Sequence, residues 1–228
     1  MCPRQQRQDF DFYLPLIMTA SAVLDVGCGT GSLLGEARAA GHRGRLCGLD
    51  PAAGMLAQAR KRIGIEWLDG DLNSVAFDAE FDLVVMSGNA FQVLIDDGEI
   101  AATLTGIRRS LAANGRFAFE TRNPQAREWE RWSARGPQVV PGPGGILIHK
   151  TLQITAPFDG RNLSFSHTFQ PPHGEPLVSH STLRFLDVEA LGGFLARAGF
   201  VIEDQFGDWD RMPVKSGSLE IVTIARRQ

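Results

Sequence analysis

The feature that most constrains this chain is a run of alternating glycines directly after a short apolar stretch, in residues 23–31. Valine and leucine surround Asp25 in the apolar part, and the glycines follow at Gly27, Gly29 and Gly31. β-Favouring residues that lead into glycines, and then into a helical pattern over residues 32–40, predict a strand, a tight turn and a helix. Such a helix directs free N–H groups and its positive dipole end beyond the carboxyl end of the strand. The turn is therefore expected to contact a ligand.

The spacing of the glycines separates two kinds of ligand. A dinucleotide fingerprint requires Gly-x-Gly-x-x-Gly, which places the third glycine at position 32 when Gly27 and Gly29 are the first pair. Ser32 occupies that position, and Asp25 interrupts a strand end that is apolar in the dinucleotide pattern. A NAD(P)-dependent oxidoreductase on a related sheet is thus the disfavoured alternative. The Asp25 carboxylate is expected either to hold the N–H groups of the turn or to face an ammonium group.

The apolar strand, the acidic residue and the Gly-x-Gly-x-Gly turn of residues 23–31 resemble the first motif of the class I S-adenosylmethionine-dependent methyltransferases. The resemblance covers residues 10–123 and 187–226. It implies an α/β fold with a doubly wound, mostly parallel, seven-stranded, Rossmann-like sheet that binds S-adenosylmethionine. In this family the last strand is antiparallel and lies beside the sixth, and the pattern of the chain permits that arrangement.

Two acidic residues that follow the second and third expected strands are the main cofactor candidates. Asp50 stands 19 residues after Gly31, the separation at which a doubly wound sheet places a carboxylate beside a ribose. The two carboxylate oxygens of Asp50 can accept hydrogen bonds from both ribose hydroxyls. Alternatively, Asp50 caps a helix that begins at Pro51. The resemblance assigns Asp71 to the adenine amino group and Leu72 to the adenine ring, with a plain turn at Asp69 and Gly70 as the alternative.

The resemblance places further residues at the cofactor. Tyr13 is a candidate lid contact, although Phe10, Phe12 and Tyr13 equally suit a role in capping the core. Pro15 is expected to break or kink any helix in this segment. The remaining cofactor-binding candidates are Asp25, Gly27, Cys28, Gly29, Gly31, Pro51, Met55, Ser87 and Gly88.

Strands and helices are expected to alternate up to residue 123. Apolar stretches at residues 23–26, 45–49, 65–68, 81–86 and 116–121, with helical patterns between them, predict a parallel sheet with right-handed crossovers. The helix after Asp50 is expected to bury Met55, Leu56, Ala59 and Ile63. A capping box over residues 96–99 opens the next helix, whose inward residues are Ile100, Leu104, Ile107 and Leu111. Residues 1–125 and 185–228 together are expected to form the S-adenosylmethionine-binding domain.

The character of the chain changes over residues 126–184. A loop too rich in glycine and proline for any regular element precedes alternating stretches at residues 146–154, 163–169 and 177–185. These stretches predict an inserted antiparallel β cap over the substrate. Asp187 is expected to cap a last helix with Val188 facing inward, and strands at residues 201–206 and 219–225 close the fold around a loop. Because small-molecule methyltransferases often carry an insertion here, the chain is similar to that branch, as in glycine and sugar-amine N-methyltransferases.

Composition limits the partners. With 228 residues and 43% hydrophobic side chains, the chain is long enough for one domain with a full core and an insertion. A net charge of −3 and the absence of any Lys/Arg run argue against nucleic acid. Three scattered cysteines, Cys2, Cys28 and Cys47, argue against disulfides and a structural zinc site, so no metal is expected. No signal peptide or membrane span is evident, which favours the cytoplasm.

The expected reaction is transfer of a methyl group from S-adenosylmethionine to an N or O nucleophile of a small molecule. Asn/Asp-Pro-Pro-Tyr/Phe and Pro-Cys motifs are absent after residue 86, which argues against adenine, glutamine and cytosine as substrates. Weak candidates for a catalytic role are His149, His167, His180 and Asn123. A non-catalytic cofactor-binding protein is a further alternative. The acceptor and the oligomeric state, with a homodimer as one option, are left open.

Overall fold

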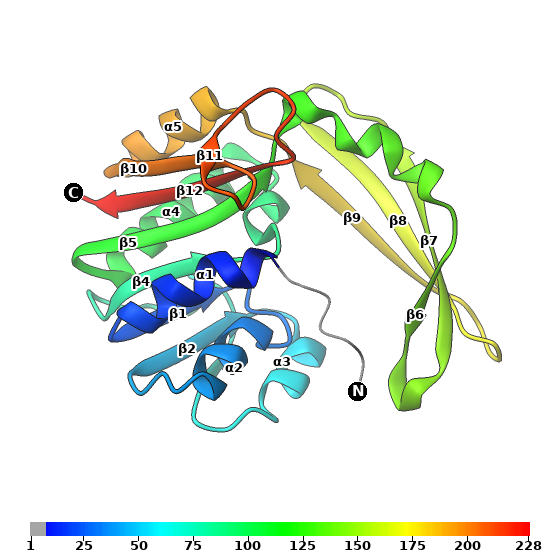
Figure 1. Ribbon diagram of the computed structural model, residues 1–228, viewed down its shortest axis with the longest axis horizontal. Helices are drawn as coiled ribbons and strands as arrows, with labels where there is room; N and C mark the ends of the chain where they lie inside the picture. Colours follow the sequence, from blue (N-terminus) through cyan, green and yellow to red (C-terminus); the bar gives the residue numbers. More distant parts are fainter. Residues whose placement is uncertain (1–7) are drawn as a thin grey trace.

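A computed structural model describes residues 8–228 and contains two β-sheets (Figure 1). The larger sheet has eight strands in the order β11-β10-β12-β5-β4-β1-β2-β3. Its strands are β1 (Ala22–Val26), β2 (Arg45–Asp50), β3 (Glu66–Asp69), β4 (Phe81–Met86), β5 (Leu111–Arg122), β10 (Phe200–Gly207), β11 (Met212–Pro213) and β12 (Glu220–Arg227). Strands β1 to β5 are parallel, and β12 runs antiparallel between β5 and β10. The expected fold class and the antiparallel last strand are confirmed.

The sheet differs from the prediction in two places. The two-residue strand β11 pairs with the end of β10 inside the segment expected to be a loop, so the sheet has eight strands and not seven. Between β3 and β4 the chain forms a loop and no helix, so the expected fivefold alternation of strand and helix is wrong at this step. Leu72 and Phe77 of this loop are buried in the core and cover the sheet where a helix was expected.

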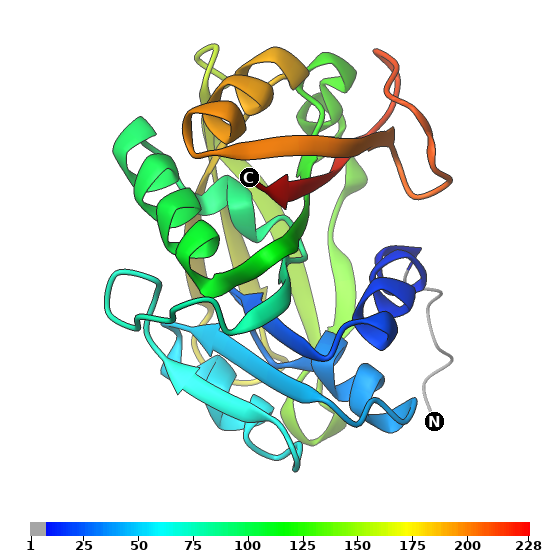
Figure 2. The same cartoon turned by 90° about the vertical axis from the view of Figure 1, so that its left-hand side faces the viewer.

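Helices cover both faces of this sheet (Figure 2). Helices α1 (Gln8–Thr19) and α2 (Ser32–Ala39) pack on one face, and α4 (Asp97–Ser110) and α5 (Val188–Arg197) pack on the other. Successive strand residues point to opposite faces, so Val23 packs with the first pair of helices and Leu24 with the second. None of the helices in the described part of the chain is both long and apolar enough to span a bilayer.

Several local expectations fail for identifiable reasons. Pro15 lies inside the continuous helix α1, which is held on the sheet by the buried side chains of Phe12, Tyr13 and Ile17. Helix α3 (Ala53–Ala59) ends before Ile63, which is 88% exposed, and Met55 in the first turn of this helix is 49% exposed. Val188 begins α5 and is also exposed. These three apolar residues were wrongly assigned to the core, because helical periodicity does not show where a short helix ends or which residues of its first turn are covered.

Side-chain caps begin the two longer helices on the second face. Asp96 accepts a hydrogen bond from the backbone N–H of Glu99, and the Glu99 carboxylate accepts one from the N–H of Asp96, which completes the predicted capping box of α4. Asp187 accepts from the N–H of Ala190 at the start of α5. Both predicted helix starts are confirmed, because the capping residues fix where each helix can begin.

The smaller sheet is antiparallel, with the order β6-β7-β8-β9. Its strands are β6 (Gln138–Pro141), β7 (Leu147–Ala156), β8 (Asn162–Gln170) and β9 (Leu177–Arg184). The three predicted strands are present, but the loop before them was wrongly thought to lack regular structure: it holds β6 and short 3₁₀ turns, η2 (Pro124–Ala126), η3 (Glu128–Arg131) and η4 (Ser133–Arg135). Trp129 and Trp132 from these turns pack on the inner face of the sheet beside Leu163, Phe165 and Leu183.

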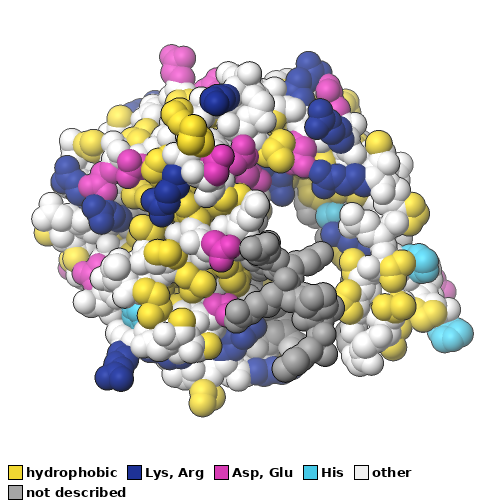
Figure 3. All heavy atoms as spheres, viewed as in Figure 1, with side chains coloured by type: hydrophobic (Ala, Val, Ile, Leu, Met, Phe, Trp, Pro, Cys, Tyr) yellow, Lys and Arg dark blue, Asp and Glu magenta, His cyan; other side chains and the backbone are white. Residues whose placement is uncertain are grey.

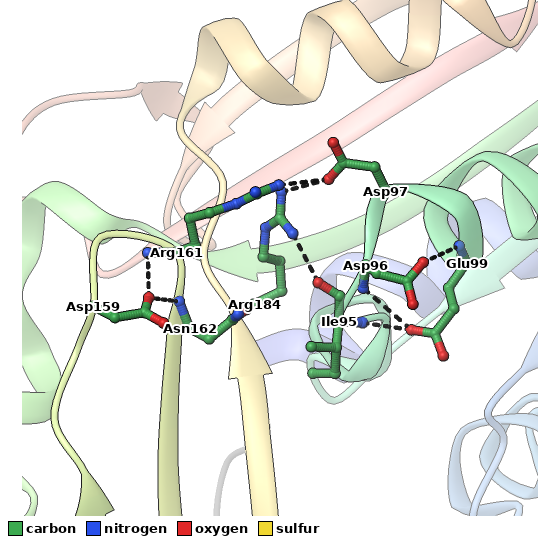
Figure 4. Close-up of polar contacts among 8 residues, drawn as sticks. All are labelled: Ile95, Asp96, Asp97, Glu99, Asp159, Arg161, Asn162 and Arg184. Atoms are coloured by element: carbon green, nitrogen blue, oxygen red, sulfur yellow. Dashed lines mark hydrogen bonds and ion pairs between the residues drawn. The ribbon is translucent and has the colours of Figure 1, made fainter.

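A polar cluster fastens the smaller sheet to the larger one (Figure 4). Arg184, at the end of β9, donates to the carbonyl oxygen of Ile95 at 2.7 Å and to the Asp97 carboxylate at 2.8 Å. Arg161, from the turn between β7 and β8, donates to the same carboxylate oxygen. Gln92 adds a link between the sheets: its side-chain N–H donates to the Arg184 carbonyl, and its side-chain oxygen accepts from the Arg122 N–H.

Replacing Arg184 with alanine is expected to destabilise the protein by about 1–3 kcal/mol, because a buried, charge-assisted hydrogen bond to the Ile95 carbonyl is lost. Arg161 is the matched control: it pairs with the same Asp97 oxygen, but its side chain is 59% exposed, so R161A is expected to cost less than about 1 kcal/mol. Urea unfolding of the two variants measures the difference. Equal destabilisation would contradict the anchoring role of Arg184.

Candidate active site

The glycine turn lies at the carboxyl end of β1. The N–H groups of Gly27 and Cys28 donate to the carbonyl oxygen of Leu49 on β2, at 2.8 and 3.2 Å. Gly27 and Gly29 both have φ in the left-handed region, at 75° and 56°. A Cβ atom on Gly27 would lie 2.9 Å from the Cβ of Ala90, whereas one on Gly29 would project into open space. The turn therefore presents bare backbone to the space above the sheet.

Asp50 holds this turn in place. Its carboxylate accepts a hydrogen bond from the N–H of Gly29 at 2.7 Å and, through the other oxygen, from the N–H of Ala52 at 2.8 Å. Pro51 precedes the first residue of α3, so it is not the first helical residue, and Asp50 supports the loop before the helix. A carboxylate has about four acceptor positions, so each Asp50 oxygen retains one for a further donor, as the ribose prediction requires.

A cavity of about 220 Å³ lies above the ends of β1 and β4. Its lining includes the predicted residues Gly27, Cys28, Gly29, Ser87 and Gly88. It also includes residues that the sequence reasoning did not select, namely Phe10, Thr30, Ser32 and Leu33. Gly31 belongs to the turn but faces away from the cavity, because a Cβ atom there would meet the indole ring of Trp67.

Carboxylates gather beneath this cavity. Asp25 is almost fully buried, and its Oδ1 has no hydrogen-bond partner among the described residues. Burial, together with the charges of Glu120 and Asp50, raises the pKa of Asp25 to about 7. Asp25 does not hold the N–H groups of the turn, because Asp50 and the Leu49 carbonyl bind those of Gly27, Cys28 and Gly29.

Tyr13 is fully buried on α1, where its hydroxyl donates to Glu120 of β5. Burial and the neighbouring Glu120 carboxylate raise the pKa of Tyr13 well above its ordinary value. Glu120 also accepts from the N–H of Asn89 at 2.6 Å. The structure thus gives Tyr13 the core-capping position, and Phe10 is the residue of α1 that lines the cavity.

The predicted adenine residues lie in the loop after β3. The exposed Asp71 carboxylate accepts hydrogen bonds from the N–H groups of Asn73 and Ser74, and the bonds from Ser74 are the largest cause of its lowered pKa. This turn follows Asp69 and Gly70, at which the alternative placed a turn, and the Asp71 carboxylate remains accessible to a ligand. Leu72 is 5% exposed and packs against Gly106 of α4, so it contributes mainly to the core. Met55 and Pro51 are exposed beside Asp50.

A second cavity, of about 410 Å³, lies between the inner face of β7 and β8 and the ends of β5 and β12. Figure 3 shows that the molecule is hollowed between these two parts. Its lining is polar and carries both charges, with Arg122, Glu128, Arg135, Lys150, His167 and Glu220 beside Trp132, Leu152 and Phe165. This cavity can accept a molecule with several polar groups.

The four catalytic candidates occupy different environments. His167 lines the second cavity, where burial and the nearby Lys150 lower its pKa. His149 and His180 are exposed and lie on the opposite face of the smaller sheet, because they pair with Gln170 and Ser166 of β8. Asn123 is buried, and its amide N–H groups donate to the carbonyl oxygens of Lys215 and Ser218, so it holds the loop before β12.

Two residues of this region were missed by the sequence reasoning. Glu220, the first residue of β12, lines the second cavity, and its Oε2 has no hydrogen-bond partner among residues 8–228. Burial raises the pKa of Glu220 to about 8, against the opposing effect of Arg122. Asn89 follows Gly88 of the first cavity, and its side chain lies close enough to Glu220 to lower the pKa of that carboxyl group. The available signal was an acidic residue at the start of an otherwise apolar strand.

Comparison with known proteins identifies the α/β part of the chain. Residues 23–115 match the family described as methyltransferase domain. Over these residues the chain is similar to methyltransferase domains. Cypemycin N-terminal methyltransferase from a Streptomyces species is 36% identical over 108 residues, which are 45% of this chain and 42% of that protein. A 2-phytyl-1,4-naphtoquinone methyltransferase from Thermosynechococcus vestitus is 36% identical over 126 residues, 53% of this chain and 54% of that protein.

The matches span about half the length of these curated relatives, whereas similarity to solved structures covers nearly the whole chain. CalS10, an amino pentose methyltransferase from Micromonospora echinaspora solved with S-adenosylmethionine bound, is similar with a TM-score of 0.68 and 23% identity. The similarity covers 96% of this chain and 88% of that one. At this identity the likeness shows a shared fold, and the solved neighbour holds S-adenosylmethionine on that fold.

The residues at the first cavity fit this cofactor. S-Adenosylmethionine carries two ribose hydroxyls, a sulfonium and an ammonium group. Asp50 retains acceptor positions for the hydroxyls, and Asp25 has an unpartnered buried oxygen for a cation. The space that a Cβ atom on Gly29 would fill admits a ligand beside the backbone. Exposed Met55 and Pro51 offer apolar surface at the end of β2 where the nucleoside would lie.

Asp25 is expected to make the stability of the free protein depend on pH. Because its folded pKa of about 7 lies above the ordinary value of 3.8, its contribution is favourable below about pH 4 and is lost as the pH rises towards 7. The free energy of unfolding is expected to fall by at most about 4 kcal/mol through this group. D25N is therefore expected to flatten the fall in unfolding free energy between pH 4 and pH 7, measured in urea. Parallel pH profiles for D25N and the wild-type protein would contradict this.

Proposed function

We propose that the protein transfers the methyl group of S-adenosylmethionine to a nitrogen or oxygen nucleophile of a small molecule. The observation that carries the proposal is the set of carboxylates at the end of the sheet: Asp25, Asp50 and Glu120 are close enough that the charges of the other two raise the pKa of Asp25. A cationic ligand offsets such a concentration of negative charge, whereas the pyrophosphate of a dinucleotide adds to it. The same arrangement therefore opposes the NAD(P) alternative.

The relation between the two cavities supports a transfer reaction. Gly88 lines the first cavity, and the side chain of the next residue, Asn89, contacts Glu220 of the second. A donor above the glycine turn and an acceptor under the smaller sheet would thus meet at the end of β4. We place the acceptor in the second cavity and assign residues 126–184 the role of substrate cap.

The chemistry required of the protein is mainly positioning. The bound cofactor supplies a methyl group on a sulfonium, which is already a good leaving group. The chain must hold the lone pair of the acceptor in line with the methyl carbon and keep water away. The turn held by Asp50 would fix the methyl donor, and the inner face of β7 and β8 would enclose the acceptor.

Nitrogen is the acceptor atom that we favour. The relatives act on different groups: the name of one refers to a peptide N-terminus, that of the solved neighbour to an amino pentose, and that of the third to a quinone. The polar, mixed-charge lining of the second cavity suits an amine with hydroxyl or carboxyl substituents better than a long apolar quinone.

Gly29→Ala is expected to weaken the binding of S-adenosylhomocysteine at least tenfold, because its Cβ atom would occupy the ligand space. Gly41→Ala is the matched control: Gly41 also has a left-handed φ, 95°, and open space around it, but it lies outside the cavity. The two substitutions carry a similar backbone cost, of about 1–2 kcal/mol. Isothermal titration calorimetry measures both affinities, and equal affinities would contradict the cofactor site.

Methyl transfer is tested by incubating the wild-type protein with S-adenosylmethionine and a panel of amines, alcohols and carboxylates. D-Glucosamine and a short peptide with a free N-terminus represent the amines. Mass spectrometry is expected to detect a methylated amine and stoichiometric S-adenosylhomocysteine. Tight binding of S-adenosylhomocysteine without any methylated product would instead indicate a non-catalytic cofactor-binding protein.

A further inference from the structure

Glu220 lies on the side of the second cavity that the larger sheet forms. It is the first residue of β12, pairs across the sheet with Arg122 of β5 and lines the second cavity. Its Oε2 is inaccessible to water and has no hydrogen-bond partner within residues 8–228. The side chain of Asn89, next to Gly88 of the first cavity, lies close enough to the same carboxylate to lower its pKa. An unsatisfied carboxylate oxygen therefore lies beside the expected path of methyl transfer.

The surroundings of Glu220 keep it near the balance between its two protonation states. Burial, and the carboxylates of Glu120 on β5 and Glu128 on η3, disfavour its charge, and Arg122 favours it. The other charged or titratable groups of the cavity are Arg135, which is ion-paired with Glu128, and Lys150 and His167 on the smaller sheet. The resulting pKa of about 8 lies between the ordinary values of a glutamic acid and of an alkylammonium group.

We propose that Glu220 is the general base that removes a proton from the ammonium form of the acceptor. This proposal rests on the proposed function and adds the residue that prepares the nucleophile. The ammonium N–H bond breaks, its proton passes to Glu220 and its electron pair becomes the nitrogen lone pair. That lone pair forms the new bond to the methyl carbon while the carbon–sulfur bond breaks, and its electrons remain on sulfur as a neutral thioether.

The match of acidities favours an amine over an alcohol. Proton transfer from an alkylammonium group, whose pKa resembles the ordinary lysine value of about 10.4, to a carboxylate of pKa about 8 is only slightly uphill. An alcohol is a far weaker acid, and a carboxylate of this kind cannot ionise it appreciably. Glu220 therefore selects acceptors that are already protonated at neutral pH.

His167 is the competing base in the same cavity. Its ring packs edge-on against Phe165 at 5.2 Å between centroids and lies on β8, on the side of the cavity formed by the smaller sheet. Glu220 belongs to the larger sheet, and its carboxylate is influenced by the side chain of Asn89, the residue after Gly88 of the methyl-donor cavity, whereas the charged group that influences His167 is Lys150 of the smaller sheet. This difference assigns the proton transfer to Glu220.

The protonation of Glu220 is measured directly by ¹³C NMR of protein labelled at the glutamate carboxyl carbons and saturated with S-adenosylhomocysteine. The signal missing from E220Q belongs to Glu220. It is expected to titrate near pH 8, and addition of methylamine or D-glucosamine is expected to shift it. E203Q is the matched control, because Glu203 is an ion-paired residue of β10 outside the cavity. A midpoint in the ordinary glutamate range, or no response to either amine, overturns the proposal.

Kinetics with an amine that the wild-type protein methylates test the same step. E220Q is expected to lower kcat/KM about 100-fold and to remove the increase in rate around pH 8, with S-adenosylhomocysteine affinity changed less than twofold. H167N is expected to retain that pH-dependent increase. If E220Q retains the wild-type pH profile while the cofactor still binds, only the role of Glu220 fails. Failure of the wild-type protein to bind S-adenosylhomocysteine would overturn the proposed function itself.

Discussion

The hydrogen bonds between Asp50 and the N–H groups of Gly29 and Ala52 are the interaction on which the site depends. They join the turn after β1 to the start of the segment after β2, so two neighbouring strand ends have one fixed geometry. The N–H groups of Gly27 and Cys28 are bound in turn by the carbonyl of Leu49. Since these groups are satisfied within the fold, the turn is preorganised and its open side, above Gly29, is available to a ligand.

This arrangement concentrates negative charge in a buried part of the protein. Asp25, Asp50 and Glu120 converge under the first cavity, and Glu220 adds a carboxylate near the second. Hydrogen bonds from Tyr13 and Asn89 satisfy Glu120, but one oxygen of Asp25 and one of Glu220 have no partner among the described residues. A buried polar atom without a hydrogen-bond partner destabilises the fold, and it is tolerated where a ligand supplies the missing partner. A sulfonium compound with an ammonium group, and an amine acceptor, are ligands of the required charge.

The sequence was most informative where local chemistry determines the structure. The glycine turn, the bond from the Ala52 N–H to Asp50 and the capping box at Asp96 each depend on residues close together in the chain, and all three are present in the structure. Contacts across the fold were not predictable. The pairing of Tyr13 with Glu120 joins residues 107 positions apart, and Glu220 approaches Asn89 only because β12 inserts beside β5. The alternating hydrophobic pattern placed His149, His167 and His180 on strands. It did not show which face of the smaller sheet is covered, and of these three histidines His167 alone lines the cavity.

The most direct test of the account is hydrogen–deuterium exchange of the wild-type protein with and without S-adenosylhomocysteine. Binding across the carboxyl ends of the parallel strands predicts added protection in peptides covering residues 27–33, 50–56 and 86–90, with little change in the outer strands of the smaller sheet. Protection confined to other segments, or no protection at saturating ligand, would contradict the placement of the cofactor and with it the central claim.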